Sequence, residues 1–456
     1  MRTIESTPEL VSSVYQKMES KLQVVRDRLN RPMTMADKVL LSHLEDPAEA
    51  ELIPGESYIL LNPDRVLLQD VLGQTAMLNF MQTGRDSTVV PTSVHCDHLI
   101  QARVEGASDL KESLQENDEV YDFLRSAAAK YGVGFWGPGA GIIHQVALEN
   151  YAFPGELMIG TDSHTPNGGG LASISVGVGG ADAVEVMAGL PWELLYPKFI
   201  GVHLTGELGG WTAPKDIILY LAGELTVSGA TNTIIEYFGP GTRSISATGK
   251  ATITNMGAEL GATTSIFAHD DRMNRYLSAT DRGALADLAD QHHHLLVPDE
   301  EVVTNPQDYF DRVVEIDLSR LEPHIVGPHS PDRARPISAL AAEVSDNTNG
   351  FVDEIDTSLI GSCTNSSYED MSRAADVADQ ARAHGMKAAT PLMVTPGSEQ
   401  VRATIERDGQ IQELEDVGAL VLANAFMEKF GGDSIPETRR NFEGYMTTVG
   451  PRKSYQ

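Results

Sequence analysis

Apolar residues first recur with a helical period near the start of this chain. Between positions 8 and 30 they are spaced four, three, four, three and four apart, the pattern of one apolar helix face. These residues are Val11, Tyr15, Met18, Leu22, Val25 and Leu29. Thr7 can cap such a helix, and Pro8 suits its first turn. The spacing therefore predicts a helix that packs at the edge of the first domain.

Farther along, short apolar runs alternate with segments of helical pattern. The segments with a helical pattern are residues 35–44, 65–83 and 368–383. The apolar runs expected to form strands are residues 88–94, 132–136, 156–159, 199–204 and 357–360. Strands that alternate with helices are typical of parallel sheets covered by helices. We therefore predict an α/β fold made of three-layer domains.

Histidines and aspartates follow three of the expected strands. The stretch IGTDSHTPNGGG at 159–170 places a carboxylate, a hydroxyl and an imidazole on consecutive residues, and its proline and glycines then force a loop. Each motif alone also fits a capping turn, a loop-orienting Asp–His pair or a buried core histidine. The carboxyl ends of parallel strands lie at one edge of a sheet, so we expect the three motifs to converge. The residues are Asp97, His98, His144, Asp162, Ser163 and His164.

Two Asp–His pairs near one site suit acid–base work on a hydroxyl group. A carboxylate beside an imidazole helps to keep the ring protonated, and a protonated ring can act as a general acid. This favours a lyase or hydratase. A Ser-His-Asp hydrolase is the competing hypothesis, but the chain lacks the G-x-S-x-G turn around that serine. A dinucleotide site is less favoured, since the glycines at 176–180 are out of register with G-x-G-x-x-G.

Composition narrows the possible partners and compartments. The 456-residue chain has 65 Asp plus Glu against 34 Lys plus Arg, a formal net charge of −31. That excess of negative charge argues against nucleic acid and anionic membranes as partners, and no apolar run is long enough to span a membrane. The first residues show no export or organelle signal. With only Cys96 and Cys363, a disulfide framework is not expected, and we predict a cytoplasmic protein.

Several longer stretches resemble the aconitases, the iron–sulfur hydro-lyases that interconvert citrate and isocitrate. The resemblance is closest to the mitochondrial-type branch and extends from about residue 35 to 425. The matching stretches, in order, are HCDHLIQA at 95–102, GIIHQVALENYAFPG at 141–155, IGTDSHTPNGGG at 159–170, GWTAPKDIIL at 210–219, EYFGPG at 236–241, NMGAELGATTSIF at 255–267, LIGSCTNSSYED at 359–370 and TPGSEQVRATIERDG at 395–409.

The resemblance implies a role for individual residues. It makes His98 the proton donor to the leaving hydroxyl, and it places Asp97, His144, Asp162 and His164 with it as catalytic residues. Substrate contacts are then implied for Gln74, Asp162, Ser163, His164 and Arg440, and a second polar layer near the metal for Asn255 and Glu259. Cys363 matches the first of three cysteines that hold a [4Fe–4S] cluster. In the family, the fourth iron of that cluster binds a tricarboxylate substrate as a Lewis acid.

The end of the sequence departs from the family. Beyond LVLANA at 420–425 the family has C-G-P-C, whereas this chain continues with Phe426-Met427-Glu428-Lys429. Arg440 can stand for one substrate arginine, but Tyr445 replaces a second. The family's C-terminal swivelling domain has no counterpart before Gln456. We expect a truncated third domain and poor retention of the cluster.

Three alternatives for function follow from that departure. The first is an aconitate hydratase. The second is a cluster-free, inactive aconitase-like protein that serves in binding or regulation. The third is a large subunit that needs a separate swivel-domain chain, as in the isopropylmalate dehydratases. In each case the expected domains are residues 1–199, which carry Gln74 and both Asp–His pairs, residues 200–319, and a truncated third domain at 320–456 that carries Cys363.

Overall fold

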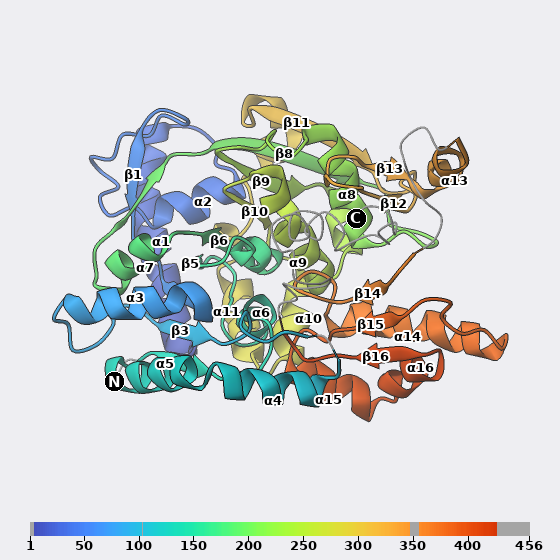
Figure 1. Ribbon diagram of the computed structural model, residues 1–456. Helices are drawn as coiled ribbons and strands as arrows, with labels where there is room; N and C mark the ends of the chain where they lie inside the picture. Colours follow the sequence, from blue (N-terminus) through green and yellow to red (C-terminus); the bar gives the residue numbers. More distant parts are fainter. Residues whose placement is uncertain (1–3, 103, 347–354, 426–456) are drawn as a thin grey trace.

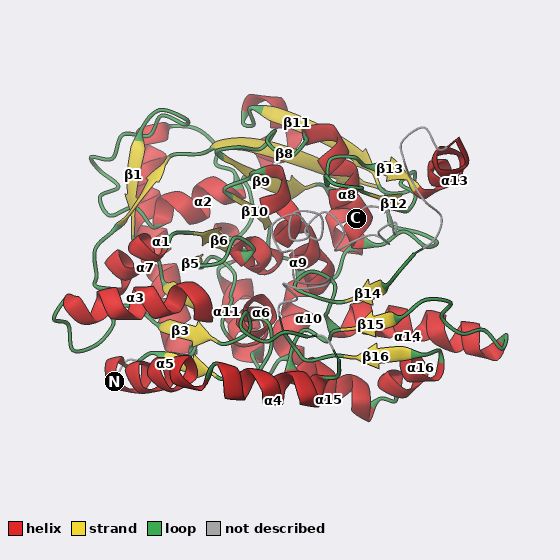
Figure 2. Ribbon diagram, viewed as in Figure 1, coloured by secondary structure: helices red, strands yellow, loops and turns green. Residues whose placement is uncertain are grey.

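The computed structural model describes residues 4–102, 104–346 and 355–425 (Figure 1). Within these ranges the chain forms helices packed around three parallel sheets, coloured by type in Figure 2. The predicted α/β class is confirmed. Among the described residues, no helix is both long and apolar enough to cross a membrane.

The first sheet has five parallel strands in the order β4-β3-β2-β5-β6. They are β2 (Arg65–Gln69), β3 (Thr92–His95), β4 (Gly134–Trp136), β5 (Leu157–Gly160) and β6 (Ile174–Gly177). The helices between and after them are α3 (Asp70–Gln82), α4 (Gly106–Glu116), α5 (Asp118–Tyr131), α6 (Ile143–Asn150) and α7 (Gly180–Met187). The chain runs outward from β2 to β4 and then returns to the other side of β2. This reversal creates a switch point between β2 and β5, where open α/β sheets hold their ligands.

One predicted boundary in this sheet is wrong. The segment 65–83 has a helical pattern, but residues 65–69 form strand β2, and the helix begins only at Asp70. All five residues of β2 are buried, because a central parallel strand is covered by helices on both faces. Such a strand shows a continuous apolar run, which periodicity alone does not separate from a helix.

The second sheet has four parallel strands in the order β10-β9-β8-β11. They are β8 (Lys198–Thr205), β9 (Thr233–Phe238), β10 (Thr264–Phe267) and β11 (Arg312–Asp317). Its helices are α8 (Pro214–Leu225), α9 (Ala247–Asn255), α10 (Asp271–Ala279), α11 (Gly283–Gln291) and α12 (Glu300–Thr304). The N-terminal helices are α1 (Pro8–Leu29), which covers the predicted helical segment, and α2 (Met35–Ser42). Two backbone N–H groups at the start of α2 donate to the buried carboxylate of Glu236 in β9.

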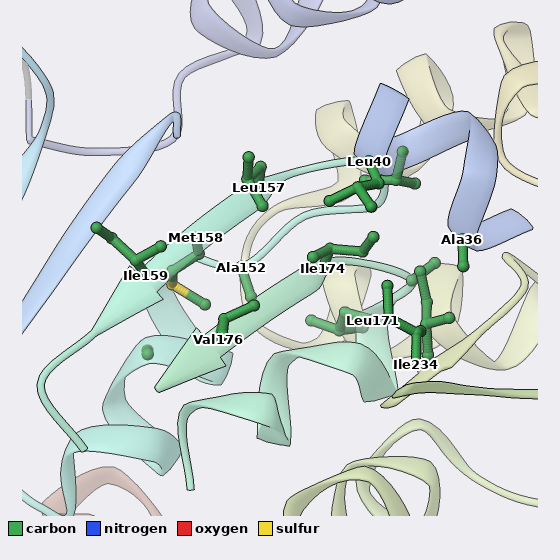
Figure 3. Packing of buried hydrophobic residues seen from close by; sticks show 14 of the residues in the cluster. Ala36, Leu40, Ala152, Leu157, Met158, Ile159, Leu171, Ile174, Val176 and Ile234 are labelled. Atoms are coloured by element: carbon green, nitrogen blue, oxygen red, sulfur yellow. The ribbon is translucent and has the colours of Figure 1, made fainter. Parts of the chain in front are cut away.

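The first two sheets share one hydrophobic core. Figure 3 shows Leu157, Ile174 and Val176 of the first sheet near Leu171, with Ile234 of the second sheet beside it. The glycine-rich 3₁₀ segment Thr165–Leu171 packs directly on α9. A β-carbon on Gly170 would lie 2.4 Å from the backbone nitrogen of Ala251 in α9. The glycines therefore allow two backbones to pack closely, in addition to forming the loop that the sequence predicts.

Replacing Gly170 with Ala is expected to destabilise the fold by about 3 kcal/mol, since neither backbone can move without disturbing the shared core. Urea unfolding monitored by circular dichroism measures this loss. Gly180→Ala is the matched control, because nothing lies within 4 Å of a β-carbon there. Equal stabilities of the two variants would contradict the proposed packing role.

The third sheet is smaller and has a hydrophobic core of its own. Its strands are parallel, in the order β14 (Ser358–Ile360), β15 (Leu392–Val394) and β16 (Ala419–Val421), with helices α14 (Tyr368–Ala383), α15 (Glu399–Arg407) and α16 (Gln410–Asp416) nearby. Two short antiparallel pairs complete the described strands: β1 (Tyr58–Leu61) with β7 (Trp192–Leu195), and β12 (His324–Ile325) with β13 (Arg335–Pro336). Helix α13 (Ile337–Asp346) lies beside β13 (Figure 1). The three sheets lie within the predicted ranges, except that β8 begins at Lys198. The division into three domains stays a prediction.

Candidate functional site

Asp162 is the centre of a buried cluster of charged side chains at the carboxyl edge of the first sheet. Its Oδ2 lies 2.8 Å from Nε2 of His98, which follows β3. Its Oδ1 lies 3.0 Å from Nε2 of His144 on α6, although that ring nitrogen forms no aligned hydrogen bond with any described residue. The backbone N–H of His164 also donates to Oδ1, at 2.8 Å. The structure thus brings the three predicted histidines around one carboxylate.

His98 lies between two carboxylates. Its Nδ1 is 3.0 Å from Asp97 Oδ1, opposite the contact of Nε2 with Asp162. Asp97 is fully buried, and its other oxygen accepts a hydrogen bond from the first N–H of α6, that of Ile143, at 2.8 Å. Both ring nitrogens therefore face an acceptor, which favours the doubly protonated imidazolium.

The charges around His98 and Asp162 shift both pKa values strongly. Burial acts to lower the pKa of His98, but Asp97 and Asp162 outweigh burial and raise this pKa well above its usual range. Burial acts to raise the pKa of Asp162, but His144, His164 and His98 outweigh it and hold this pKa well below its usual range. At neutral pH the cluster thus holds an imidazolium and a carboxylate with almost no exposure to water.

His164 continues the cluster toward the second and third sheets. Its Nε2 is 3.3 Å from Oε1 of Glu259, and Ser163 Oγ lies 3.3 Å from its Nδ1. Burial acts to lower the pKa of His164, but Cys363, Asp162 and Glu259 together raise it well above its usual range. The site thus holds a second imidazole with a strong tendency to keep its proton.

Cys363 is joined to the cluster by a chain of polar side chains. It follows β14 and is fully buried, with Sγ 3.4 Å from Thr364 Oγ1. That hydroxyl donates to Asn255 at 3.3 Å, and Asn255 donates to Asn167 at 3.4 Å. Asn167 in turn donates to the backbone oxygen of His144 at 3.4 Å. Loops from all three sheets thus meet around the predicted residues.

The structure also shows where the other predicted substrate contacts lie relative to the cluster. Gln74 turns back to its own helix and donates to the backbone oxygen of Asp70 at 3.0 Å. Ser163 is exposed and contacts only the ring of its neighbour His164. Arg440 lies outside the described residues. The roles of these three residues as substrate contacts stay predictions.

Sequence reasoning missed Asp70 as a member of the site. Its fully buried carboxylate accepts hydrogen bonds from the backbone N–H groups of His98, at 3.1 Å, and Leu99, at 3.3 Å. Burial, with the nearby Asp97, raises the pKa of Asp70 to about 7. Asp70 therefore fixes the loop that carries His98. Asp70 directly follows strand β2, and this position is the signal that would have identified it. The predicted helix from residue 65 hid that strand end.

A buried serine–glutamate hydrogen bond joins helix α6 of the first sheet to the third sheet. Ser398 Oγ, in the loop after β15, donates to Oε1 of Glu149 at 2.8 Å. In the same contact, the N–H of Ile142 donates to the oxygen of Gly397 at 2.8 Å. Burial raises the pKa of Glu149 to about 7, against opposing effects of Ser398 and Arg282. The third sheet is thus anchored one helical turn from His144.

Replacing Glu149 with Gln is expected to make the protein's stability less dependent on pH. The native pKa lies above the unfolded value, so the native state keeps this proton longer and stability falls as pH rises from about 4.5 through 7. The fall is on the order of 3 kcal/mol, which Glu149→Gln removes while the acceptor for Ser398 is retained. Urea unfolding at pH 5 and pH 8 measures it, with the exposed Glu406→Gln as control. An unchanged slope in Glu149→Gln would contradict this assignment.

Comparison with known proteins decides the family. The model of the aconitase family (aconitate hydratase) matches residues 37–446. The chain belongs to the aconitase family. It is 59% identical to the mitochondrial aconitate hydratase of Emericella nidulans over 411 residues, covering 90% of this chain and 52% of that protein. It is 57% identical to the corresponding protein of Saccharomyces cerevisiae over 412 residues, with the same coverage. The chain therefore spans about half the length of the curated relatives that it matches.

Among solved structures, the chain matches aconitase X of Thermococcus kodakaraensis in its holo-form. The TM-score is 0.45 at 12% sequence identity, over 81% of this chain and 79% of that one.

The prediction of a cytoplasmic protein is contradicted by these comparisons, because the relatives are mitochondrial enzymes. The prediction rested on the small number of cysteines and on the lack of a recognisable organelle signal in the first residues. That number indicates only that thiols stay reduced, and it does not distinguish one reducing compartment from another.

Aconitase-family proteins bind a [4Fe–4S] cluster, but the residues of this chain do not supply a full set of ligands for one. Such a cluster is held by cysteine thiolates. The sequence contains Cys96 and Cys363 only. Cys96 packs in the hydrophobic core of the first two sheets, where burial raises its pKa to a value that disfavours the thiolate. One thiol, that of Cys363, remains for the cluster.

Proposed function

We propose that this chain forms the tricarboxylate-binding and proton-donating part of an aconitate hydratase, a hydro-lyase that interconverts citrate and isocitrate through cis-aconitate. One observation carries the proposal: three histidines converge on Asp162, and two of them have strongly raised pKa values. Protonated rings offer cationic donors to carboxylates and an acid for a departing hydroxyl. The names of the relatives support the same reaction and a mitochondrial setting.

Within this proposal each residue has a role that follows from its position. His98 is held between Asp97 and Asp162 and serves as the acid toward the substrate hydroxyl. His164, paired with Glu259, holds a second proton and binds a substrate carboxylate together with the exposed Ser163. Asp162 keeps the rings charged. The Lewis-acid chemistry of a [4Fe–4S] cluster needs thiolate ligands that this chain does not contain, so no step is assigned to an iron–sulfur cluster.

A separate chain that carries the swivel domain stays part of the proposal, whereas retention of a [4Fe–4S] cluster by this chain does not. The α/β fold, the strand-end histidines and the family membership do not depend on either. The cluster-free alternative predicts the same ligand binding without turnover. The two alternatives therefore differ in the reaction and agree on the ligand.

A ligand panel tests the proposed substrate class. Citrate, isocitrate and cis-aconitate are each expected to shift the imidazole NMR signals of His98 and His164 and to compete with one another. 3-Isopropylmalate, a dicarboxylate, and acetate, a monocarboxylate, are the controls. Both are expected to bind at least tenfold more weakly, since each has fewer carboxylates to pair with these rings than a tricarboxylate has. Equal affinity for all five acids would contradict a tricarboxylate site.

The pH dependence of binding follows from the raised pKa of His98. This pKa lies above the ordinary value near 6.5, so the ring keeps its charge at neutral pH and loses it as pH rises through the native pKa. Citrate affinity is therefore expected not to decrease from pH 6 to 7, while citrate gains its last charge, and to fall by about tenfold per unit above the native pKa of His98. Calorimetric titration over this range measures the fall. An affinity that decreases between pH 6 and 7 would show that His98 has an ordinary pKa.

A further inference from the structure

A cavity lies at the edge of the first sheet opposite the histidine cluster. Its volume is about 650 Å³, within the range of small-molecule sites in proteins. The segments 62–64 and 89–91, which directly precede β2 and β3, form one side, and a face of α1 forms the other. The strands are parallel, so this amino edge and the carboxyl edge with Asp162 are separated by the length of the sheet.

Most of the cavity lining is apolar. Leu10, Val14 and Met18 recur at helical spacing along α1, and Val89, Val90 and Pro91 face them from the loop before β3. Met18 is buried, whereas Val90 is only half-buried, so the wall is apolar in its depth and accessible toward its mouth. A cavity of this kind accepts the apolar body of a ligand.

The acidic group in the lining is already engaged. Oδ2 of Asp64 accepts from the backbone N–H of Leu157 at 3.0 Å and lies 2.8 Å from Nε2 of His43. The other ring nitrogen of His43 is 2.7 Å from the backbone oxygen of Val39. Oδ2 of Asp64 and both ring nitrogens of His43 are thus engaged within the protein.

Two lysines remain, one helical turn apart on the same face of α1. Lys17 forms no side-chain hydrogen bond or ion pair with any residue that the structure describes, and its side chain is exposed. The ammonium group of Lys21 donates to the backbone oxygen of Leu44 and has two further protons to donate. Burial lowers the pKa of Lys21, so an anion beside it would gain a poorly hydrated partner. Glu45 and Asp64 act on Lys21 from a distance and oppose the effect of burial on its pKa, but neither forms an ion pair with it. In a chain of net charge −31, two neighbouring cations that form no ion pair with a described residue make a local anion-binding feature.

We propose that this cavity binds an amphipathic organic anion, with its apolar body against α1 and the loop before β3 and its carboxylate at Lys17 and Lys21. The depth of the cavity is apolar, its mouth carries the two cations, and its acidic group, Asp64, is bound by His43 and by the backbone N–H of Leu157. The site is separate from the histidine cluster and does not depend on the proposed reaction.

Titration with decanoate, measured by calorimetry on the 456-residue chain, tests the proposal. We expect saturable binding of one decanoate per chain, with decan-1-ol at least tenfold weaker because it lacks the charge. Lys21→Met and Lys17→Met are each expected to weaken decanoate binding about fivefold. Lys111→Met, at an exposed helical lysine outside the cavity, is the matched control and should bind as the unmodified chain does.

Filling the cavity gives a second, independent measurement. Val14→Trp is expected to abolish decanoate binding, and Val90→Phe, at a less buried position, should reduce it where Val14→Trp fails to fold. Citrate binding at the histidine cluster should remain in Val90→Phe, which separates this site from that one. Three results would overturn the proposal: no saturable binding, equal affinity for decanoate and decan-1-ol, or binding unaffected by Val90→Phe. Light scattering that shows a dimer with decanoate excluded would overturn it as well, since a second copy would then occupy the cavity.

Discussion

Anaerobic reconstitution with iron and sulfide is expected to leave this chain without a [4Fe–4S] cluster, and cis-aconitate hydration is expected to stay at background. The chain offers Cys363 as its one matched thiolate, and one thiolate does not hold a cubane tightly. Loss of a Lewis acid costs several kcal/mol of transition-state stabilisation, which corresponds to a rate loss of about a thousandfold or more. Iron and sulfide analysis, the visible absorption spectrum and the ultraviolet absorbance of cis-aconitate measure these outcomes.

A double substitution makes this prediction specific to the missing thiols. Phe426→Cys with Lys429→Cys restores the spacing of the family's C-G-P-C segment directly after LVLANA. This variant is expected to take up iron and sulfide in near-stoichiometric amounts, and adding Cys363→Ser to it should abolish the uptake. An intact cluster spectrum from the unmodified chain would show that its ligands have been misassigned.

Replacing Asp162 with Asn is expected to have the largest effect of any single change at the histidine cluster. Three imidazoles lie around this carboxylate, and removing one partner of a buried ion pair costs about 3–5 kcal/mol. The pKa of His98 should fall by more than one unit, because the ring then loses its contact with Asp162 and only Asp97 and the more distant Asp70 still oppose the effect of burial. Urea unfolding and NMR titration of the imidazole signals measure the two effects.

Asp122→Asn is the matched control for that variant. Asp122 pairs with Arg125 on the surface of α5, where both side chains are more than half exposed. Its loss should change stability by less than about 1 kcal/mol and leave every imidazole pKa as it was. A His98 pKa that is the same in Asp162→Asn and Asp122→Asn would show that the central carboxylate does not hold the proton on this ring.

Much of the site follows from one rule applied to the sequence. Asp97, His98 and Asp162 were predicted to converge because each follows a strand of the first sheet, and the parallel pairing of β3, β2 and β5 places them together. The same rule would have found Asp70, had residues 65–69 been recognised as a strand. A buried parallel strand has no polar face, so its pattern resembles that of a buried helix.

Other parts depend on contacts between distant segments. Glu259 reaches His164 from the second sheet, and only the resemblance to the aconitases predicted it. The glycines at 168–170 predicted a loop, but nothing in their order shows that α9 would pack against them. The resemblance also implied Gln74 as a substrate contact; its side chain bonds to its own helix in this structure, and that role stays a prediction. Local patterns fix which residues can do the chemistry, and the packing of distant segments decides which of them meet.

Calorimetric titration of citrate into the chain at pH 7 tests the central claim most directly, namely that the cluster around Asp162 binds a tricarboxylate without a metal cluster. The account predicts saturable binding of one citrate per chain, weakened at least tenfold in His98→Gln and unchanged in Asp122→Asn. Absence of binding in the folded, unmodified chain, or equal affinity in His98→Gln, would contradict it.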